Sequence, residues 1–318
     1  MSIFAGFAED VVGVDITDDY IIAARVRATR EGGFELRNAG WTEHAPSASD
    51  KDVAALLRKL WQQCGIPSYT VCSCLRSHSM MLRHFKHPQL SDSERESALW
   101  LQAEETLQVP RRDIVMDWHV HVEPVPSALA SGATPGAEGL LVAAPRKDID
   151  RHLALLEMAG LSPVIVDIGC MAVCNLFLAL NGPARIPGAV CLLNLSTHTA
   201  DMAVLMKDGW MYPHMLVSRS TAWEGSADYL CAHISDVLKY YHFKLRREPV
   251  QRLVLTGRIP PQGDFLRVIS ERTGLPVDVW DPLPGLTVKS AGLRQRLELN
   301  PAIGPLMAAS LGLALRRN

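Results

Sequence analysis

The segment Gly13-Val14-Asp15-Ile16-Thr17-Asp18-Asp19 decides the fold, because it is a short apolar strand that ends in a polar turn. A second apolar strand over residues 20–26 follows the turn, and this pattern predicts a β-hairpin. The second half of the chain repeats the pattern with Leu192-Leu193-Asn194-Leu195-Ser196-Thr197 and the apolar stretch 202–206. Two such hairpins predict a duplicated fold whose turns face a central cleft.

Both turns lack a glycine directly after the first strand. Thr17 and Ser196 stand where a glycine would let the backbone approach a phosphate closely. Thr17 is also β-branched, which disfavours positive φ and directs a side chain toward any ligand at the turn. The hairpins therefore have the strand–turn–strand pattern of phosphate-binding turns but lack the glycine that would let the backbone contact a phosphate.

The composition predicts a folded globular chain. The 318 residues suffice for two domains of ordinary size, and 48% of them are hydrophobic and 21% charged. The net charge of -2 gives no global basic field for nucleic acid, and we interpret the basic segments 244–247 and 316–317 as solvated helix ends. Seven cysteines without a framework spacing indicate buried free thiols in a reducing cytoplasm.

The chain carries no pattern of a secretory or membrane-spanning segment. Residues 1–10 lack a basic region and contain Glu9 and Asp10, unlike a signal peptide. The longest apolar stretch, 161–180, is interrupted by Pro163, Asp167 and Gly169 and predicts a strand followed by a buried helix. We expect a cytoplasmic protein that reaches a membrane only through another molecule.

The order of predicted elements recurs in the two halves. The first half reads as strands over 11–16, 20–26 and 34–41 and a helix over 50–64 capped by Ser49, which is typical of a ribonuclease-H-like layer. The second half reads as strands over 189–195, 199–206 and 210–217, a helix over 223–247, a strand over 252–256, a helix over 264–273, a strand over 275–279 and a closing helix over 301–316. This repetition predicts a duplicated α/β architecture.

The region between the hairpins has its own elements. Ser91 and Glu94 form a capping box at the start of a helix that ends before Pro110, with an apolar stripe at residues 98, 101 and 107. Around this helix we expect strands over 68–75, 79–85, 114–122 and 139–144, a loop over 123–138, a helix over 147–159 closed by Gly160, a strand over 164–167, a helix over 170–180 and a linker over 181–187.

These residues resemble the actin-like ATPase superfamily and, within it, the PilM family of type IV pilus assembly proteins. Residues 13–16 resemble the first phosphate motif, 192–197 the second, and 253–257 the strand and turn beneath the adenosine. Residues 90–122, with Asp117-Trp118, resemble the small inserted SHS2 subdomain of the family. Segments 140–144, 155–160, 166–167 and 309–316 are also similar to the family, so the resemblance spans essentially the whole chain.

The resemblance implies an actin-like, duplicated ribonuclease-H-like fold of two domains with an inserted small α+β subdomain. The first domain would span 1–185, with the insertion at about 66–145, and the second 186–300. A C-terminal helix over 301–318 would pack back on the first domain.

The resemblance also implies a function. Family members are cytoplasmic scaffolds of type IV pilus or related type II secretion-like assembly, peripheral to the inner membrane through a protein partner. That partner is the N-terminal cytoplasmic tail of a PilN-like inner-membrane protein, and its groove would lie within residues 68–122. Components of the pilus motor ATPase and further copies of this chain are additional candidate partners, and nucleic acid is not one.

By resemblance, the nucleotide cleft would be formed by Asp15, Thr17, Asp18, Asp19, Asn194, Ser196, Thr197, Gly257 and Arg258. Asp15 would hold Mg²⁺ through water. Asp18 and Asp19 replace small hydroxyls and would repel a polyphosphate by about 1–4 kcal/mol per contact at about 4 Å. Asn194 lacks the charge of the family's aspartate, whereas Arg258 could contact a phosphate or stack on a base. We predict a degenerate site without ATP hydrolysis or a required cofactor, and bound ATP with Mg²⁺ stays an open alternative.

Other readings carry less weight. A working ATPase of the same fold, filament-forming or sugar-kinase-like, would need an acidic base and a substrate pocket near Asp15, and neither is evident. His119 and His121 lie on one face of a strand but lack third and fourth ligands at zinc-site spacing. We interpret Asp167-Ile168-Gly169 as structural and the aromatic residues of 240–243 as part of a core.

Overall fold

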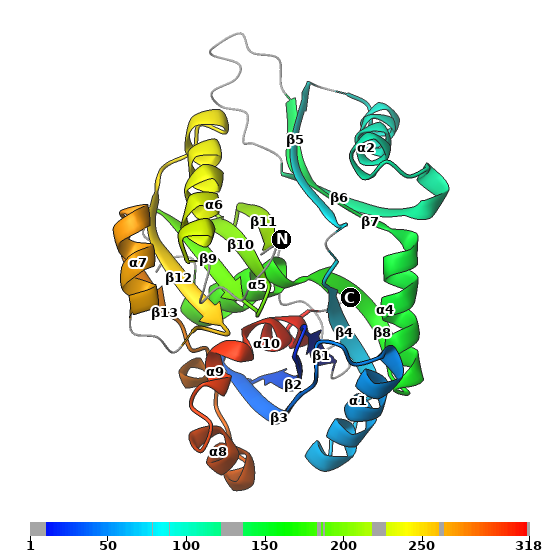
Figure 1. Ribbon diagram of the computed structural model, residues 1–318, viewed down its shortest axis with the longest axis vertical. Helices are drawn as coiled ribbons and strands as arrows, with labels where there is room; N and C mark the ends of the chain where they lie inside the picture. The colour runs from blue at the N-terminus through cyan, green and yellow to red at the C-terminus, as the bar shows by residue number, and fades with distance from the viewer. Residues whose placement is uncertain are drawn as a thin grey trace. The chain divides into compact units, whose positions relative to one another are not determined.

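In the computed structural model, the strand β1 (Val12–Ile16) lies at the centre of a five-stranded sheet (Figure 1). The order of this sheet is β3-β2-β1-β4-β8. β2 runs antiparallel to β1 and pairs with β3, whereas β4 runs parallel to β1 and to β8. The other strands are β2 (Tyr20–Ala28), β3 (Phe34–Glu43), β4 (Thr70–Leu75) and β8 (Ser162–Ile168).

A second five-stranded sheet repeats the first position by position, in the order β11-β10-β9-β12-β13. Its central strand β9 pairs antiparallel with β10 and parallel with β12, as β1 does with β2 and β4. The duplicated α/β fold predicted from the two hairpins is therefore confirmed. The strands are β9 (Ala189–Leu195), β10 (Thr199–Met206), β11 (Met211–Val217), β12 (Val250–Gly257) and β13 (Val277–Val279).

The structure describes residues 11–77, 79–88, 90–121, 136–182, 186, 188–217, 227–260 and 264–316. The chain divides into a larger unit, residues 1–76 with 154–318, and a smaller unit, residues 77–153. Residues 66–76, which the sequence assigns to the insertion, include β4 of the first sheet. Of the predicted features, residues 1–10, most of the 123–138 loop, four residues of the 181–187 linker and the first four residues of the helix expected over 223–247 lie outside the described residues.

Helices of the larger unit cover the two sheets and bury apolar stripes against them. On α1, Ser49 and Asp52 form a capping box, and Leu57, Leu60 and Trp61 are buried. On the second sheet, α6 and α7 contribute Leu230, Ile234, Phe265 and Ile269 to one core. The helices are α1 (Asp50–Cys64), α5 (Gly169–Asn181), α6 (Ala227–Lys239), the π-helical segment η4 (Tyr240–Lys244), α7 (Asp264–Thr273), the 3₁₀ turn η5 (Leu283–Gly285), α8 (Ala291–Glu298), α9 (Ile303–Leu306) and α10 (Ala308–Ala314).

The C-terminal helix α10 packs directly on β1 and α5 (Figure 1). A Cβ atom on Gly13 would lie 1.9 Å from the carbonyl oxygen of Ser310, and one on Gly312 would lie 2.0 Å from that of Ala172. Contacts this short leave room for no side chain at either position. The glycine that begins the first motif therefore serves helix packing.

The smaller unit is a three-stranded antiparallel sheet, in the order β5-β7-β6, with α2 packed on it. Phe85, Leu99 and Leu141 are among the buried residues of its core. Its elements are β5 (Met81–Pro88), α2 (Asp92–Leu107), the 3₁₀ turn η1 (Arg111–Asp113), β6 (Ile114–His121), β7 (Gly136–Pro145) and the start of α4 (Arg146–Met158), which continues into the larger unit.

Several local predictions are wrong. The stripe of α2 is shifted, because Leu99 and Ala103 are buried and Leu101 is 58% exposed. The strand expected over 139–144 begins at residue 136, and α8 was not predicted. The closing helix is broken into α9 and α10 at Met307. Among the aromatics of η4, Tyr241 is buried but Phe243 is 70% exposed.

Candidate functional site

The turns after β1 and β9 share one hydrogen-bond pattern. The backbone N–H of Thr17 donates to the carbonyl of Tyr20, and that of Ser196 donates to the carbonyl of Thr199, both at 2.8 Å. The Thr17 hydroxyl accepts the Tyr20 N–H at 2.9 Å, and the Ser196 hydroxyl lies 3.1 Å from the Thr199 carbonyl. The two residues that stand in place of glycine therefore close their own turns.

The three segments predicted from the sequence meet at Asp19. The Thr197 hydroxyl donates to Asp19 Oδ2 at 2.8 Å, and Arg258 Nη1 donates to the same oxygen. The Arg258 guanidinium also lies over the ring of Tyr20, 5.4 Å from its centroid. Asp18 is partly buried in the same turn. Residues far apart in the sequence are thus joined through one carboxylate of the first hairpin.

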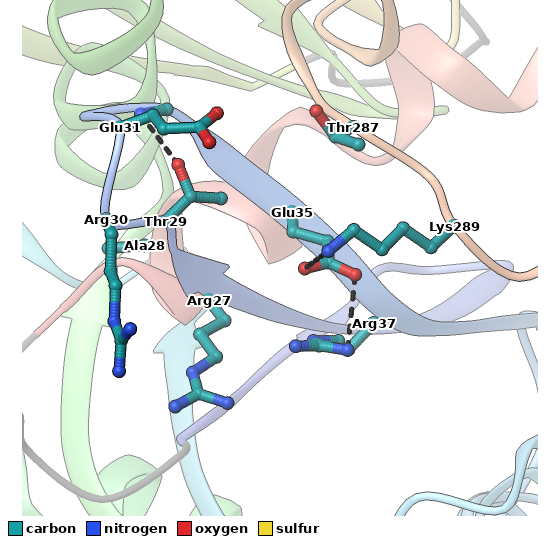
Figure 2. A pocket seen from close by; sticks show the side chains of 10 residues that line it. Arg27, Ala28, Thr29, Arg30, Glu31, Glu35, Arg37, Thr287 and Lys289 are labelled. Carbon is teal, nitrogen blue, oxygen red and sulfur yellow. Dashed lines mark hydrogen bonds and ion pairs between the residues drawn. The ribbon is translucent and has the colours of Figure 1, made fainter.

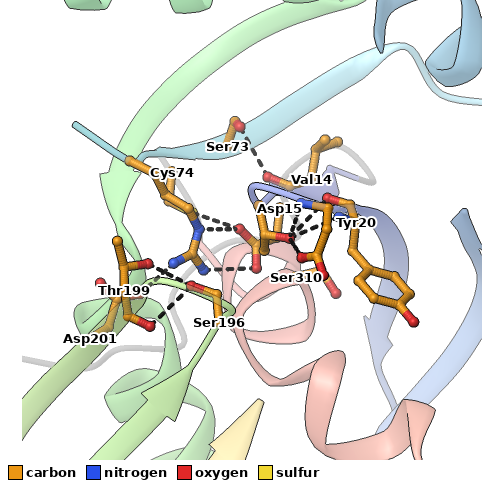
Figure 3. A network of polar contacts seen from close by, with 12 residues as sticks. Val14, Asp15, Tyr20, Ser73, Cys74, Ser196, Thr199, Asp201 and Ser310 are labelled. Atoms are coloured by element: carbon orange, nitrogen blue, oxygen red, sulfur yellow. Dashed lines mark hydrogen bonds and ion pairs between the residues drawn. The ribbon is translucent and has the colours of Figure 1, made fainter. Parts of the chain in front are cut away.

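Asp15 is buried at the end of β1 (Figure 3). It is bound by Arg76, which the sequence prediction missed. Arg76 donates from Nε to Asp15 Oδ1 and from Nη2 to Oδ2, each at 3.0 Å. The Cys74 thiol donates to Oδ1 at 3.2 Å. Arg76 Nη1 donates at 3.0 Å to Asp201 Oδ2 on β10. One guanidinium therefore joins the central strand of the first sheet to the hairpin of the second.

The electrostatics keep Arg76 charged. Burial alone would lower the pKa of Arg76, but the carboxylates of Asp15 and Asp201 outweigh burial and hold this pKa well above its ordinary value. Burial, assisted by the Asp15 charge, raises the pKa of the Cys74 thiol well above its usual range, so the thiol remains a hydrogen-bond donor. The buried carboxylates thus face a permanent cation.

Asp201 is bound by two side chains, Arg76 and Asn194, and lies against Gly169. It lies opposite Asn194 in the β9–β10 register, and the Asn194 side chain hydrogen-bonds to it. A Cβ atom on Gly169, at the start of α5, would lie 2.2 Å from Asp201 Oδ2. The glycine of Asp167-Ile168-Gly169 therefore makes room for this carboxylate, while Asp167 pairs with Arg316 at 2.6 Å.

Gly257 lies where the end of β12 passes β9. Its φ is +82°, and a Cβ atom there would lie 2.2 Å from the Leu195 carbonyl oxygen and 2.5 Å from Asn194 Oδ1. The next residue, Arg258, donates its backbone N–H to the Leu195 carbonyl at 2.7 Å. The space beside Gly257 that a side chain would otherwise fill is therefore occupied by residues of β9.

Arg76 and Arg258 occupy the same position in the two matching sheets, directly after β4 and β12. Each pairs with an aspartate from the hairpin of the other half, Asp201 for Arg76 and Asp19 for Arg258. We call the residues of this site the turn cluster: Asp15, Asp19, Arg76, Asn194, Thr197, Asp201 and Arg258. The sequence did hold a signal for Asp201, since a lone carboxylate within an apolar strand requires a partner when buried.

Two further observations concern ligands and membranes. Across the described residues, no group of three or more His, Cys, Asp or Glu side chains is arranged to hold a metal ion. In the smaller unit, His84 Nε2 lies 2.8 Å from Glu138 Oε1. No helix in the described part of the chain is both long and apolar enough to cross a membrane.

The family model of the type IV pilus assembly protein PilM matches residues 13–216, more than half of the chain. The chain belongs to this family. Its fold matches a chain of the PilM–PilN type IV pilus biogenesis complex with a TM-score of 0.79 and 18% identity, over 96% of this chain and 98% of that one. It also resembles the ethanolamine utilization protein EutJ from Carboxydothermus hydrogenoformans, with a TM-score of 0.52 and 11% identity, over 97% and 90% of the two chains. At these identities the solved structures show the actin-like fold alone, and no curated protein matches the chain.

Proposed function

We propose that this PilM-family chain is a cytoplasmic scaffold of a type IV pilus, or of a related type II secretion-like machine. In this role it binds the N-terminal tail of a PilN-like inner-membrane protein and is held at the membrane by that contact. The observation that carries the proposal is the likeness to the PilM–PilN complex over 96% of this chain, together with membership of the family. We propose that the tail lies within residues 68–122, which include β5, α2 and β6.

We further propose that the scaffold works without bound nucleotide. Both oxygens of Asp15 accept N–H groups of Arg76 at 3.0 Å, so a hydrated Mg²⁺ at Asp15 would meet a fixed positive charge. At Asp19, one oxygen, Oδ2, accepts hydrogen bonds from both Thr197 and Arg258. The carboxylates of the turn cluster also outnumber its guanidinium groups, which disfavours a polyphosphate. These residues do not fit Mg²⁺ with a nucleotide, because the chain supplies its own cations.

Titration with a synthetic peptide of the tail of a PilN-like protein tests the first proposal. We expect saturable binding and slower amide hydrogen exchange within residues 68–122 of the full chain. A scrambled peptide of the same composition is the control. Protection confined to the second sheet, residues 189–279, would contradict the proposed location, and equal binding of the scrambled peptide would contradict the proposed function.

Measurement of ATP turnover and of the melting temperature with Mg-ATP tests the second proposal. A ligand at 100 times its Kd stabilises a protein by about 2.7 kcal/mol, so tight binding would shift the melting temperature by several degrees. We expect no turnover and little shift. A clear stabilisation that Asp15→Asn abolishes would contradict the proposal that nucleotide is dispensable.

The alternative function is an active ATPase of the same fold, filament-forming or sugar-kinase-like. ATP turnover together with undetectable tail binding at high micromolar peptide would favour it. Contacts with pilus motor ATPase components and self-association stay predictions of the family resemblance. Sedimentation of the purified chain with and without Mg-ATP would test self-association.

A further inference from the structure

A pocket of about 660 Å³ lies on the β2–β3 hairpin of the larger unit, away from the residues used above (Figure 2). The hairpin and the segment after η5 form its walls. The lining residues are Arg27, Ala28, Thr29, Arg30, Glu31, Gly33, Glu35, Arg37, Thr287 and Lys289.

Backbone hydrogen bonds define the shape of the pocket. The hairpin turn is closed by the Thr29 N–H, which donates to the Gly33 carbonyl at 2.8 Å, and Gly32 takes the positive φ of +84° that the turn needs. On the other wall, Thr287 makes two strand-like bonds to β3, each at 2.9 Å. Its carbonyl accepts the Leu36 N–H, and its own N–H donates to the Phe34 carbonyl. These bonds fix both walls without a ligand.

The pocket lining carries four basic side chains against two carboxylates, Glu31 and Glu35, and is therefore positively charged although the whole chain carries a net charge of -2. Glu35 is only 3% exposed and lies between two cations, 3.2 Å from Arg37 and 3.5 Å from Lys289. In Figure 2 the guanidinium groups of Arg27 and Arg30 extend away from this carboxylate. Neither Arg27 nor Arg30 has an ion-pair partner within the described residues, so both are available to an anion.

We propose that this pocket binds a phosphate-bearing anion. A guanidinium presents a planar fork of N–H groups that matches a phosphate in two parallel hydrogen bonds. The volume of about 660 Å³ lies within the range of about 300–1,000 Å³ typical of small-molecule sites, which suits a phosphorylated headgroup or metabolite. Arg27 and Arg30 bind the phosphate oxygens, and Arg37 and Lys289, fixed by Glu35, complete the positive field. A lipid headgroup and a free phosphorylated small molecule share this chemistry.

The test uses the full chain and two probes. Pyrophosphate is titrated calorimetrically, and vesicles of phosphatidylcholine with phosphatidylglycerol are compared with phosphatidylcholine vesicles by co-sedimentation. The double variant Arg27→Gln/Arg30→Gln removes the two unpaired cations. The matched control, Lys51→Gln/Lys59→Gln, removes the same charge from exposed positions of α1.

We expect at least one probe to bind and the double variant to weaken it while the control binds like the wild type. The loss should be on the order of tenfold per side chain for pyrophosphate. It should be about fivefold per side chain for the vesicles. Binding of pyrophosphate without vesicles identifies a free ligand, and binding of phosphatidylglycerol vesicles without pyrophosphate identifies a lipid headgroup.

Three results would overturn the proposal: binding of neither probe, equal weakening by the control variant, or tighter binding of a hexaglutamate peptide than of either phosphate probe. The last result would assign the pocket to protein carboxylates. None of these measurements involves the PilN-like tail, so their failure leaves the proposed scaffold function untouched.

Discussion

Arg76 and Arg258 follow equivalent strands of two matching sheets, yet their environments differ. The Arg76 side chain is 12% exposed and makes hydrogen bonds to two buried carboxylates. The Arg258 side chain is 47% exposed and pairs with Asp19, which is 16% exposed. The two halves therefore share the same topology, and each arginine pairs with an aspartate of the other half. They differ in how deeply the arginine side chain is buried.

This difference determines how much each pair is worth. An exposed ion pair contributes about 0–1 kcal/mol, because water and salt screen it. Removal of one partner from a buried pair costs about 3–5 kcal/mol, because the remaining charge stays buried and unpaired. We infer that Arg76 contributes most of the stability that the ion pairs of the turn cluster provide, and that Arg258 contributes a smaller part.

The largest effect is expected for Arg76→Ala. It leaves Asp15 and Asp201 buried without their cation, and the free energy of unfolding should fall by about 3–5 kcal/mol in urea denaturation. Arg76→Lys keeps the charge but cannot make the same forked contacts, so its loss should be intermediate. A loss for Arg76→Ala smaller than that for Arg258→Ala would contradict the comparison.

Gly257→Ala tests the backbone that places Arg258. The added Cβ would lie 2.2 Å from the Leu195 carbonyl oxygen at a φ of +82°, so strain and overpacking together should cost about 2–4 kcal/mol. Gly209→Ala is the matched control, because Gly209 has a φ of +85° and no atom within 4 Å of the added Cβ. Its cost should be about 1–2 kcal/mol from backbone strain alone. Equal losses of stability for the two variants, measured by thermal unfolding, would show that the close contact between Gly257 and β9 adds nothing to the cost of the substitution.

Arg258→Ala should lower the free energy of unfolding by less than about 1 kcal/mol. High salt should abolish this loss, since salt screens exposed pairs, whereas the loss for Arg76→Ala should persist. Urea denaturation at low and high ionic strength measures both. A salt-independent loss for Arg258→Ala would mean that the Asp19 pair is shielded like the Asp15 pair.

The smallest expected effect is the pH dependence of stability that arises from Tyr20, whose ring lies beneath the Arg258 guanidinium. Burial, the hydrogen bond to Glu43 at 2.5 Å and the Glu43 charge raise the pKa of Tyr20 to about 12. Because the folded pKa lies above the unfolded value of 10.0, the neutral phenol stabilises the fold below about pH 10, and this contribution is lost as the pH rises toward 12.

A difference absorbance titration against Tyr20→Phe measures this ionisation. Glu43→Gln should lower the pKa, because it removes the negative charge that disfavours phenolate. Arg258→Ala should raise it, because the Arg258 charge favours phenolate. A pKa that does not respond to Arg258→Ala would show that this arginine does not act on Tyr20.

Elements whose signals are local were predicted closely from the sequence. α1 has its predicted bounds, and the capping box of Ser91 and Glu94 is present at α2. Caps depend on residues three apart, which the sequence displays directly. The face of α2 was misassigned because an apolar residue such as Leu101 carries no mark of which side meets the sheet.

The candidate site was predicted in part. The three segments at Asp15, Asn194 and Gly257 were identified, and Asp19, Thr197 and Arg258 do come together. The pairing of Arg76 with Asp201 was missed, because the two residues lie 125 positions apart and the sequence does not show which cation meets the buried carboxylate. The exposed pocket at Arg27 and Arg30 was missed for the same reason, since Lys289 reaches Glu35 only in the folded chain.

The sequence by itself determined the two hairpins, the duplicated α/β order and the replacement of the turn glycines, because strand periodicity and turn chemistry are local properties. Only the tertiary structure decided that Arg76 lies between Asp15 and Asp201. That contact requires the two sheets to bring β4 and β10 together, where a buried carboxylate must find a cation. Tertiary packing, and not any local pattern, therefore determines that these residues bind each other.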